Sequence, residues 1–390
     1  MEEKKQTYLN VLSKNPNDTR ALFKLAMTLT HDSNGQQSII LPSGESMKKE
    51  QLLLKVIDLD RNYAQAYSKL GVILSYQNRS SIILPTGQSM TQQQLYLKAI
   101  ECNPIYAKSH YNLATTLSYG ESITLNNGQS MTVLQLYLKS IELDPTHSDS
   151  YNNLANKLIS GETITLPNGQ MMSKQQLYFK SIECDPNNTN TYKNLASFMA
   201  VGETVILNNG QTMTKQQIYL KTIELKPNDP IPYYLLANQL GRDETITLLN
   251  GKSMNNIQLY LKSISLDPSF YYPYNNLAIT IGRNETITIP SGESLTKKQL
   301  YLKAIQLDPT KYYSYYNLTL DMTSKETITL HNGVTMTKQQ LLLEALTFET
   351  TQISIYKDIG LTLLNNKQTI TLPNGELMSR RQLLRRARNY

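Results

Sequence analysis

Tryptophan is absent from this chain of 390 residues, and cysteine, histidine and phenylalanine are scarce. The four histidines (His31, His110, His147 and His331) are scattered, and no pair of them has the spacing of metal ligands. The glycines form no phosphate-binding loop, because each recurrent glycine is explained by a turn. We therefore expect a protein that is not an enzyme and that holds no metal and no cofactor.

Long apolar runs are missing as well. No stretch approaches the length of a membrane-spanning helix. The N-terminal sequence, MEEKKQTYLN, is charged and lacks the apolar core of a secretory signal. These observations predict a cytoplasmic protein that does not enter a membrane.

The chain instead has a strict period. Its turn glycines stand at Gly44, Gly87, Gly128, Gly169, Gly210, Gly251, Gly292, Gly333 and Gly375. Successive glycines differ by 43 residues, then by 41 six times, then by 42. A fixed period of this length indicates a repeat array, in which each unit buries its apolar face against its neighbours. We expect residues 1–390 to form one continuous domain.

One repeat unit reads ETITLPNGQMMSKQQLYFKSIECDPNNTNTYKNLAS, from Glu162 to Ser197. Alternation over residues 162–166 and the turn Pro167-Asn168-Gly169 predict a short β-hairpin. The hydroxyl-x-x-Gln spacing of Ser173 and Gln176 predicts a capping box at the start of a helix, which Pro186 closes. A second helix follows the proline.

The width of one hairpin is close to the distance between two packed helices. Two strands occupy about 9.6 Å, and packed helices lie about 8–10 Å apart. We hypothesise that neighbouring hairpins pair into a continuous ribbon. Met172 is expected to pin its hairpin onto the adjoining helices.

The helix after the proline carries Tyr192, Leu195 and Ala196, and the helix before it carries Tyr178 and Ser181. This Tyr-x-x-Leu-Ala pattern, with an aromatic and a small residue in the other helix and then proline, resembles the tetratricopeptide repeat. The family's unit has 34 residues, and the hairpin accounts for the difference from 41. The resemblance implies a mainly α fold, a right-handed α-solenoid of about nine repeats that begins and ends on the helix called B.

In that family the helix called A lines a concave groove that binds a protein segment or an extended peptide. Eight residues after each proline, this helix carries asparagine in five units: Asn112, Asn153, Asn194, Asn276 and Asn317. These asparagines, similar to the ladders of long tetratricopeptide superhelices, could hold a peptide backbone through their amide groups. The alternative is that they bond the adjacent helix.

Other positions of the expected groove change along the chain. Early units offer Lys108, Asn152, Asp149 and Lys193, and later units offer Tyr234, Tyr272, Tyr313 and Tyr316. A tyrosine-lined stretch suits proline-rich or apolar segments, although the same tyrosines could serve packing between helices.

We therefore expect a non-catalytic scaffold that binds a protein or an extended peptide. A structural alternative is self-association through hairpin edges or end helices. Nucleic-acid binding is the third candidate, because lysines recur on helix B (Lys98, Lys139, Lys180, Lys221, Lys262 and Lys303). Four of these six lysines are followed by glutamate three residues later, which largely neutralises the row.

Overall fold

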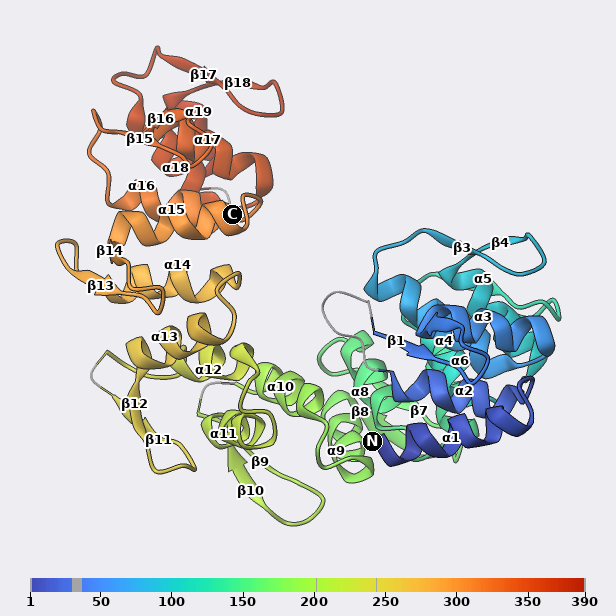
Figure 1. Cartoon of the computed structure of the whole chain (residues 1–390). Coiled ribbons are helices and arrows are strands. Elements are labelled where there is room, and N and C mark those ends of the chain that lie inside the picture. The colour runs from blue at the N-terminus through green and yellow to red at the C-terminus, as the bar shows by residue number, and fades with distance from the viewer. Residues whose placement is uncertain (1, 30–36, 201, 243, 389–390) are drawn as a thin grey trace. The chain divides into compact units, whose positions relative to one another are not determined.

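The computed structural model describes residues 2–29, 37–200, 202–242 and 244–388. Two compact units can be distinguished: Met1–Phe198 with Ile206–Thr212, and Met199–Val205 with Met213–Tyr390. Each unit is a succession of helices joined alternately by a hairpin and by a short turn (Figure 1). That all 390 residues act as one domain stays a prediction. His31, one of the four histidines, lies outside the described residues.

The odd-numbered helices are the B helices, which follow the hairpins and precede the prolines. Their bounds are α1 Glu2–Lys14, α3 Lys49–Leu59, α5 Gln92–Cys102, α7 Val133–Leu143, α9 Lys174–Cys184, α11 Lys215–Leu225, α13 Asn256–Leu266, α15 Lys297–Leu307, α17 Lys338–Phe348 and α19 Arg380–Arg386. The first and the last described helix, α1 and α19, are both B helices.

The even-numbered helices are the A helices. Their bounds are α2 Thr19–Thr28, α4 Ala64–Tyr76, α6 Ala107–Ala114, α8 Ser148–Lys157, α10 Thr189–Phe198, α12 Pro230–Ala237, α14 Tyr271–Thr280, α16 Tyr312–Leu320 and α18 Ile353–Thr362. Each hairpin lies between an A helix and the following B helix, which confirms the predicted helix–hairpin–helix unit and the mainly α solenoid fold. The right-handed sense of the solenoid stays a prediction.

Every strand has three residues. The strands are β1 Ser38–Ile40, β2 Ser46–Lys48, β3 Ser81–Ile83, β4 Ser89–Thr91, β5 Ser122–Thr124, β6 Ser130–Thr132, β7 Thr163–Thr165, β8 Met171–Ser173, β9 Thr204–Ile206, β10 Thr212–Thr214, β11 Thr245–Thr247, β12 Ser253–Asn255, β13 Thr286–Thr288, β14 Ser294–Thr296, β15 Thr327–Thr329, β16 Thr335–Thr337, β17 Thr369–Thr371 and β18 Leu377–Ser379.

The hypothesis of a continuous ribbon is wrong. Among the described residues the strands form nine separate two-stranded sheets, each made by one hairpin alone. A matching width is not enough for two hairpins to pair, because their strand edges must also face each other. Each hairpin turns one face onto the helices, where Ile164 lies opposite the buried Met172. The predicted anchoring role of Met172 is therefore confirmed.

The predicted turn and helix signals are present. Gly169 has a φ of +83°, a backbone conformation that glycine adopts readily and residues with a Cβ atom rarely adopt. The backbone N–H of Ser173 donates to Gln176 Oε1 (2.8 Å), and that of Gln176 to Ser173 Oγ (3.4 Å), which completes the capping box. The same box begins the B helices at Thr214, Thr296 and Ser379.

Two further side chains close the end of α8, and several other A helices end in the same way. Glu162 accepts a hydrogen bond from the backbone N–H of Ile159 (2.8 Å), and the Lys174 ammonium donates to the carbonyl of Leu158 (2.9 Å). Backbone groups at helix ends need such partners. The recurrence of glutamate before the first strand and of lysine at the start of the B helix was the available signal.

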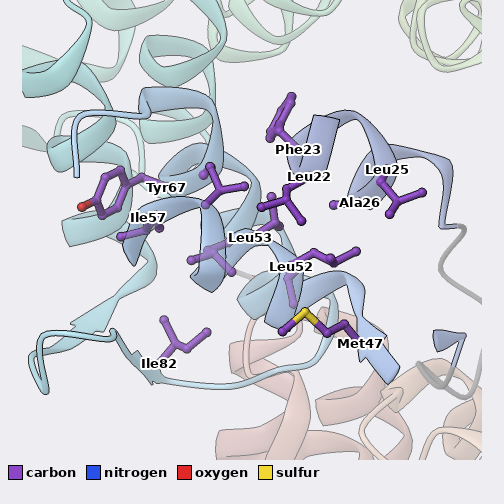
Figure 2. Close-up of a cluster of buried hydrophobic side chains, with 14 of the residues drawn as sticks. Leu22, Phe23, Leu25, Ala26, Met47, Leu52, Leu53, Ile57, Tyr67 and Ile82 are labelled. Atoms are coloured by element: carbon purple, nitrogen blue, oxygen red, sulfur yellow. The ribbon is translucent and has the colours of Figure 1, made fainter. Parts of the chain in front are cut away.

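The core runs through each unit between successive helices. Leu22 and Leu25 of α2 and Leu52 and Leu53 of α3 are fully buried, and Met47 of the first hairpin packs beside them (Figure 2). In α9 the stripe of Leu177, Tyr178, Ser181 and Ile182 is buried as well. No described helix has both the length and the apolar character that crossing a membrane requires.

Candidate peptide-binding groove

In the first unit, the A helices α4, α6 and α8 border a cavity of about 460 Å³, which we call the unit-1 groove. Lys69 and Asn112 lie along it, and Lys108, Tyr111 and Asp149 also line it. The structure therefore brings together three residues that the sequence predicted for a groove, namely Lys108, Asn112 and Asp149. Lys69 is an addition, and it occupies the position that asparagine holds in later A helices.

The unit-1 groove carries two ammonium groups, of Lys69 and Lys108, and one carboxylate, of Asp149. Burial lowers the pKa of Lys69, and the neighbouring Lys108 ammonium lowers it further. In the described residues neither ammonium is joined to a carboxylate by a salt bridge. A group of two ammonium ions that disfavour each other is stabilised when a negative charge enters between them.

His147 forms one wall of this groove, immediately before α8. Its ring lies edge-on to Tyr111, with 4.9 Å between ring centroids, and its Nδ1 is 2.7 Å from the Ser150 hydroxyl. Burial lowers the pKa of His147, Asp149 opposes that shift, and Lys108 adds to it. The imidazole is therefore held by a hydrogen bond and is largely neutral at pH 7.

The predicted asparagines bond the adjacent A helix. In each case the side-chain amide N–H donates to the preceding A helix: Asn112 to Ser68 Oγ (3.0 Å), Asn153 to Tyr111 Oη (3.1 Å), Asn194 to Asn152 Oδ1 (2.9 Å), Asn276 to Asn238 Oδ1 (2.9 Å) and Asn317 to Asn275 Oδ1 (3.3 Å). We call these five residues the ladder asparagines. This is the alternative that the sequence left open, and contact with a peptide stays a prediction.

Asn152 illustrates how the ladder is built. It is buried on α8, donates its own amide N–H to Asn153 Oδ1 (2.9 Å) and accepts from Asn194. Asn152 therefore links two A helices, and its burial leaves little of its side chain for contact with a ligand. Lys193, on the next A helix, is half-buried.

The predicted tyrosines of the second unit form an aromatic cluster with their neighbours. Tyr272 stacks on Tyr271 at 4.1 Å between centroids and lies 6.1 Å from Tyr313, and Tyr234 lies 5.4 Å from both Tyr272 and Phe270. Burial raises the pKa of Tyr313, and the neighbouring Tyr271 raises it further. Packing between A helices is therefore part of their role, while the half-buried rings of Tyr234, Tyr272 and Tyr313 also leave surface for a ligand.

Tyr316 lies one helical turn from this cluster on α16. Its hydroxyl donates to Asp358 on α18, at 3.0 Å. It therefore joins two A helices, as the ladder asparagines do.

The lysine row on the B helices is tied to glutamates. Lys98, Lys139, Lys180 and Lys221 form salt bridges of 2.6–3.0 Å with the glutamate three residues later. Two of those glutamates also hold the next hairpin, because Asn126 donates to Glu101 and Asn208 donates to Glu183. Four of the six lysines in the row are thus engaged in salt bridges on the B helices.

A family model described as "Tetratricopeptide repeat" matches residues 95–135, 136–176 and 177–217. These three segments follow one another without a gap, and each spans a B helix, an A helix and the hairpin after it. The chain is a tetratricopeptide-like repeat protein. A comparison with curated protein sequences finds no match.

Solved structures of low sequence identity are similar to this tetratricopeptide-like chain. One is YrrB, described as a TPR protein with an unusual peptide-binding site, with 14% identity, a TM-score of 0.31, and coverage of 58% of this chain and 98% of YrrB. Another is yeast Tom70, with 13% identity, a TM-score of 0.37, and coverage of 93% of this chain and 81% of Tom70.

Proposed function

We propose that this interaction scaffold binds an extended protein segment along its A helices and carries out no catalysis itself. The observation that carries the proposal is the unit-1 groove, where Lys69 and Lys108 face a cavity of about 460 Å³ without a carboxylate salt bridge. A segment with acidic side chains would supply the missing charge. The ladder asparagines would fix the spacing of the A helices that line the groove.

The second unit supports a different preference. The half-buried faces of Tyr234, Tyr272 and Tyr313 offer flat apolar surface with polar hydroxyl groups, which suits proline-rich or apolar residues. We assign acidic residues to the unit-1 groove and apolar residues to the aromatic cluster of the second unit.

The proposal is tested by fluorescence anisotropy with a labelled octa-glutamate peptide. The full chain should bind it, and the pair Lys69→Ala and Lys108→Ala should weaken binding at least tenfold, about 1.4 kcal/mol. Lys98→Ala is the matched control, because Lys98 is already paired with Glu101 on a B helix.

Two results would overturn the assignment of an acidic segment. One is equal weakening by Lys98→Ala and by the double variant. The other is stronger binding of a random oligonucleotide than of the peptide, with a steep loss on adding salt, which would favour nucleic acid. Light scattering at high protein concentration separately tests self-association, for which a strict monomer is the negative result.

A further inference from the structure

Two A helices lack the tyrosine that the other A helices carry as their fourth residue: α2, which has Leu22 there, and α6. In five repeats the hydroxyl of this tyrosine donates to a backbone carbonyl six residues earlier: Tyr67 to Arg61 (3.0 Å), Tyr151 to Pro145 (3.1 Å), Tyr233 to Pro227 (3.1 Å), Tyr274 to Pro268 (3.1 Å) and Tyr356 to Thr350 (2.8 Å). In α6 this position is His110. The described residues place no hydrogen-bond donor on the carbonyl of Pro104.

His110 is itself incompletely satisfied. It is 2% exposed; its Nδ1 has no partner that meets full hydrogen-bond geometry among the described residues, although the backbone of Tyr106 is close enough to raise its pKa against the effect of burial. The imidazole is shorter than a phenol and cannot place a hydroxyl group where the other repeats have one. A buried nitrogen without a partner is rare in proteins and calls for an explanation.

The cavity beside His110 is larger than two grooves at equivalent places in other repeats. Around α11 and α12 a groove of about 330 Å³ ends at Pro227 and Tyr233. Around α15 a different groove of about 300 Å³ lies between the B helix and two hairpins. Around α6 and α7, residues equivalent to both grooves line one cavity of about 470 Å³, in which Pro104 and His110 form one end. Replacement of the tyrosine by histidine thus accompanies the joining of the two grooves.

The walls of the joined cavity fit an aromatic group with a polar edge. Ile100 and Leu125 supply apolar surface beside His110, and the exposed amides of Gln129 and Gln135 lie further along. The Gln135 Oε1 already accepts from the backbone N–H of Thr132 (2.8 Å), which leaves its amide N–H groups as donors. Lys139 and Glu142 pair with each other at the rim (3.0 Å).

We propose that this hairpin-side cavity is a second binding site, which takes the phenol of a tyrosine presented by an extended segment of a partner protein. The ring lies against Ile100 and Leu125, and the hydroxyl donates to the Pro104 carbonyl, as the chain's own tyrosines do in five repeats. The neighbouring amides of Gln129 and Gln135 contact the partner's backbone. This site is formed by a B helix and hairpins and is distinct from the A-helix groove of the proposed function.

The test is titration of the full chain with p-cresol and with N-acetyltyrosine amide, followed by NMR. Both should bind saturably, N-acetyltyrosine amide more tightly, and toluene should bind at least tenfold more weakly than p-cresol because it lacks the hydroxyl. His110→Tyr should weaken p-cresol binding at least tenfold, since it fills the cavity with the chain's own phenol. His110→Phe provides a second filling variant should the first one fold poorly.

Tyr151→His is the reverse variant and should create a second p-cresol site in the next repeat. Unchanged p-cresol binding in both His110 variants, or equal binding of toluene and p-cresol, would overturn the proposal. Binding of octa-glutamate to the unit-1 groove should be unaffected by His110→Tyr, so failure at one site is distinguishable from failure at the other.

Discussion

Asn153 and Asn194 should contribute to stability, because their amides join successive A helices. Asn153→Ala removes the donor to Tyr111 and the acceptor for the buried Asn152 amide. Asn194→Ala leaves the Asn152 oxygen without that donor. An unsatisfied buried polar group costs about 1–3 kcal/mol. We therefore expect each single variant to lower the free energy of unfolding by about that amount.

The two losses should not add. Both asparagines bond Asn152. The change in the free energy of unfolding of the double variant should therefore differ from the sum of the two single changes by about 0.5 kcal/mol or more. The assay is urea unfolding followed by circular dichroism. Asn190→Ala on α10 is the matched control, since Asn190 is exposed and a surface change of this kind shifts stability by less than about 0.5 kcal/mol. Unfolding midpoints equal to that of the control would refute the structural role and leave the asparagines free for a partner.

Three further predictions concern the turn, the groove and the histidines. Gly169→Ala should lower the free energy of unfolding by about 1–2 kcal/mol, because alanine disfavours the left-handed backbone conformation. A steric clash adds nothing, since no atom lies within 4 Å of the added methyl group. An unchanged melting temperature would contradict this prediction. Lys69→Met should raise the melting temperature, because burial disfavours the charged lysine, while it weakens octa-glutamate binding; a fall in melting temperature would count against the assigned electrostatics. Burial lowers the pKa of both His110 and His147, so the unfolded chain binds more protons below the ordinary histidine pKa of 6.5, and stability should fall as pH decreases through and below that value. Calorimetry at pH 8 and pH 5 should show this fall, and the double variant His110→Gln and His147→Gln should reduce it.

The local structure could be predicted because its signals are local. The turn of Gly169, the capping box of Ser173 and Gln176, and the buried stripe that includes Tyr178 each depend on residues close together in the chain. The hydroxyl of Tyr178 donates to Asn156 Oδ1, at 2.7 Å. In each case the repeat gives the same signal many times, which strengthens the inference from any one unit.

The arrangement of side chains between units could not be read in the same way. Nothing in the sequence decides whether Asn153 turns toward a ligand or toward Tyr111 on the neighbouring helix. The hairpin orientation was missed for the same reason, because it depends on how Met172 and its neighbours pack. His110 was noted only as an isolated histidine. Comparison with the tyrosines at the same place in other repeats was the signal that could have marked it.

The short length of the strands bears on association between polypeptide chains. A flank that carries many hairpins offers many open strand edges, each a place where another polypeptide could attach. Here each described strand has only three residues, and the hairpin of β7 and β8 turns the buried Met172 toward the helices. Short strands of this kind are one of the means by which natural proteins limit pairing at open sheet edges.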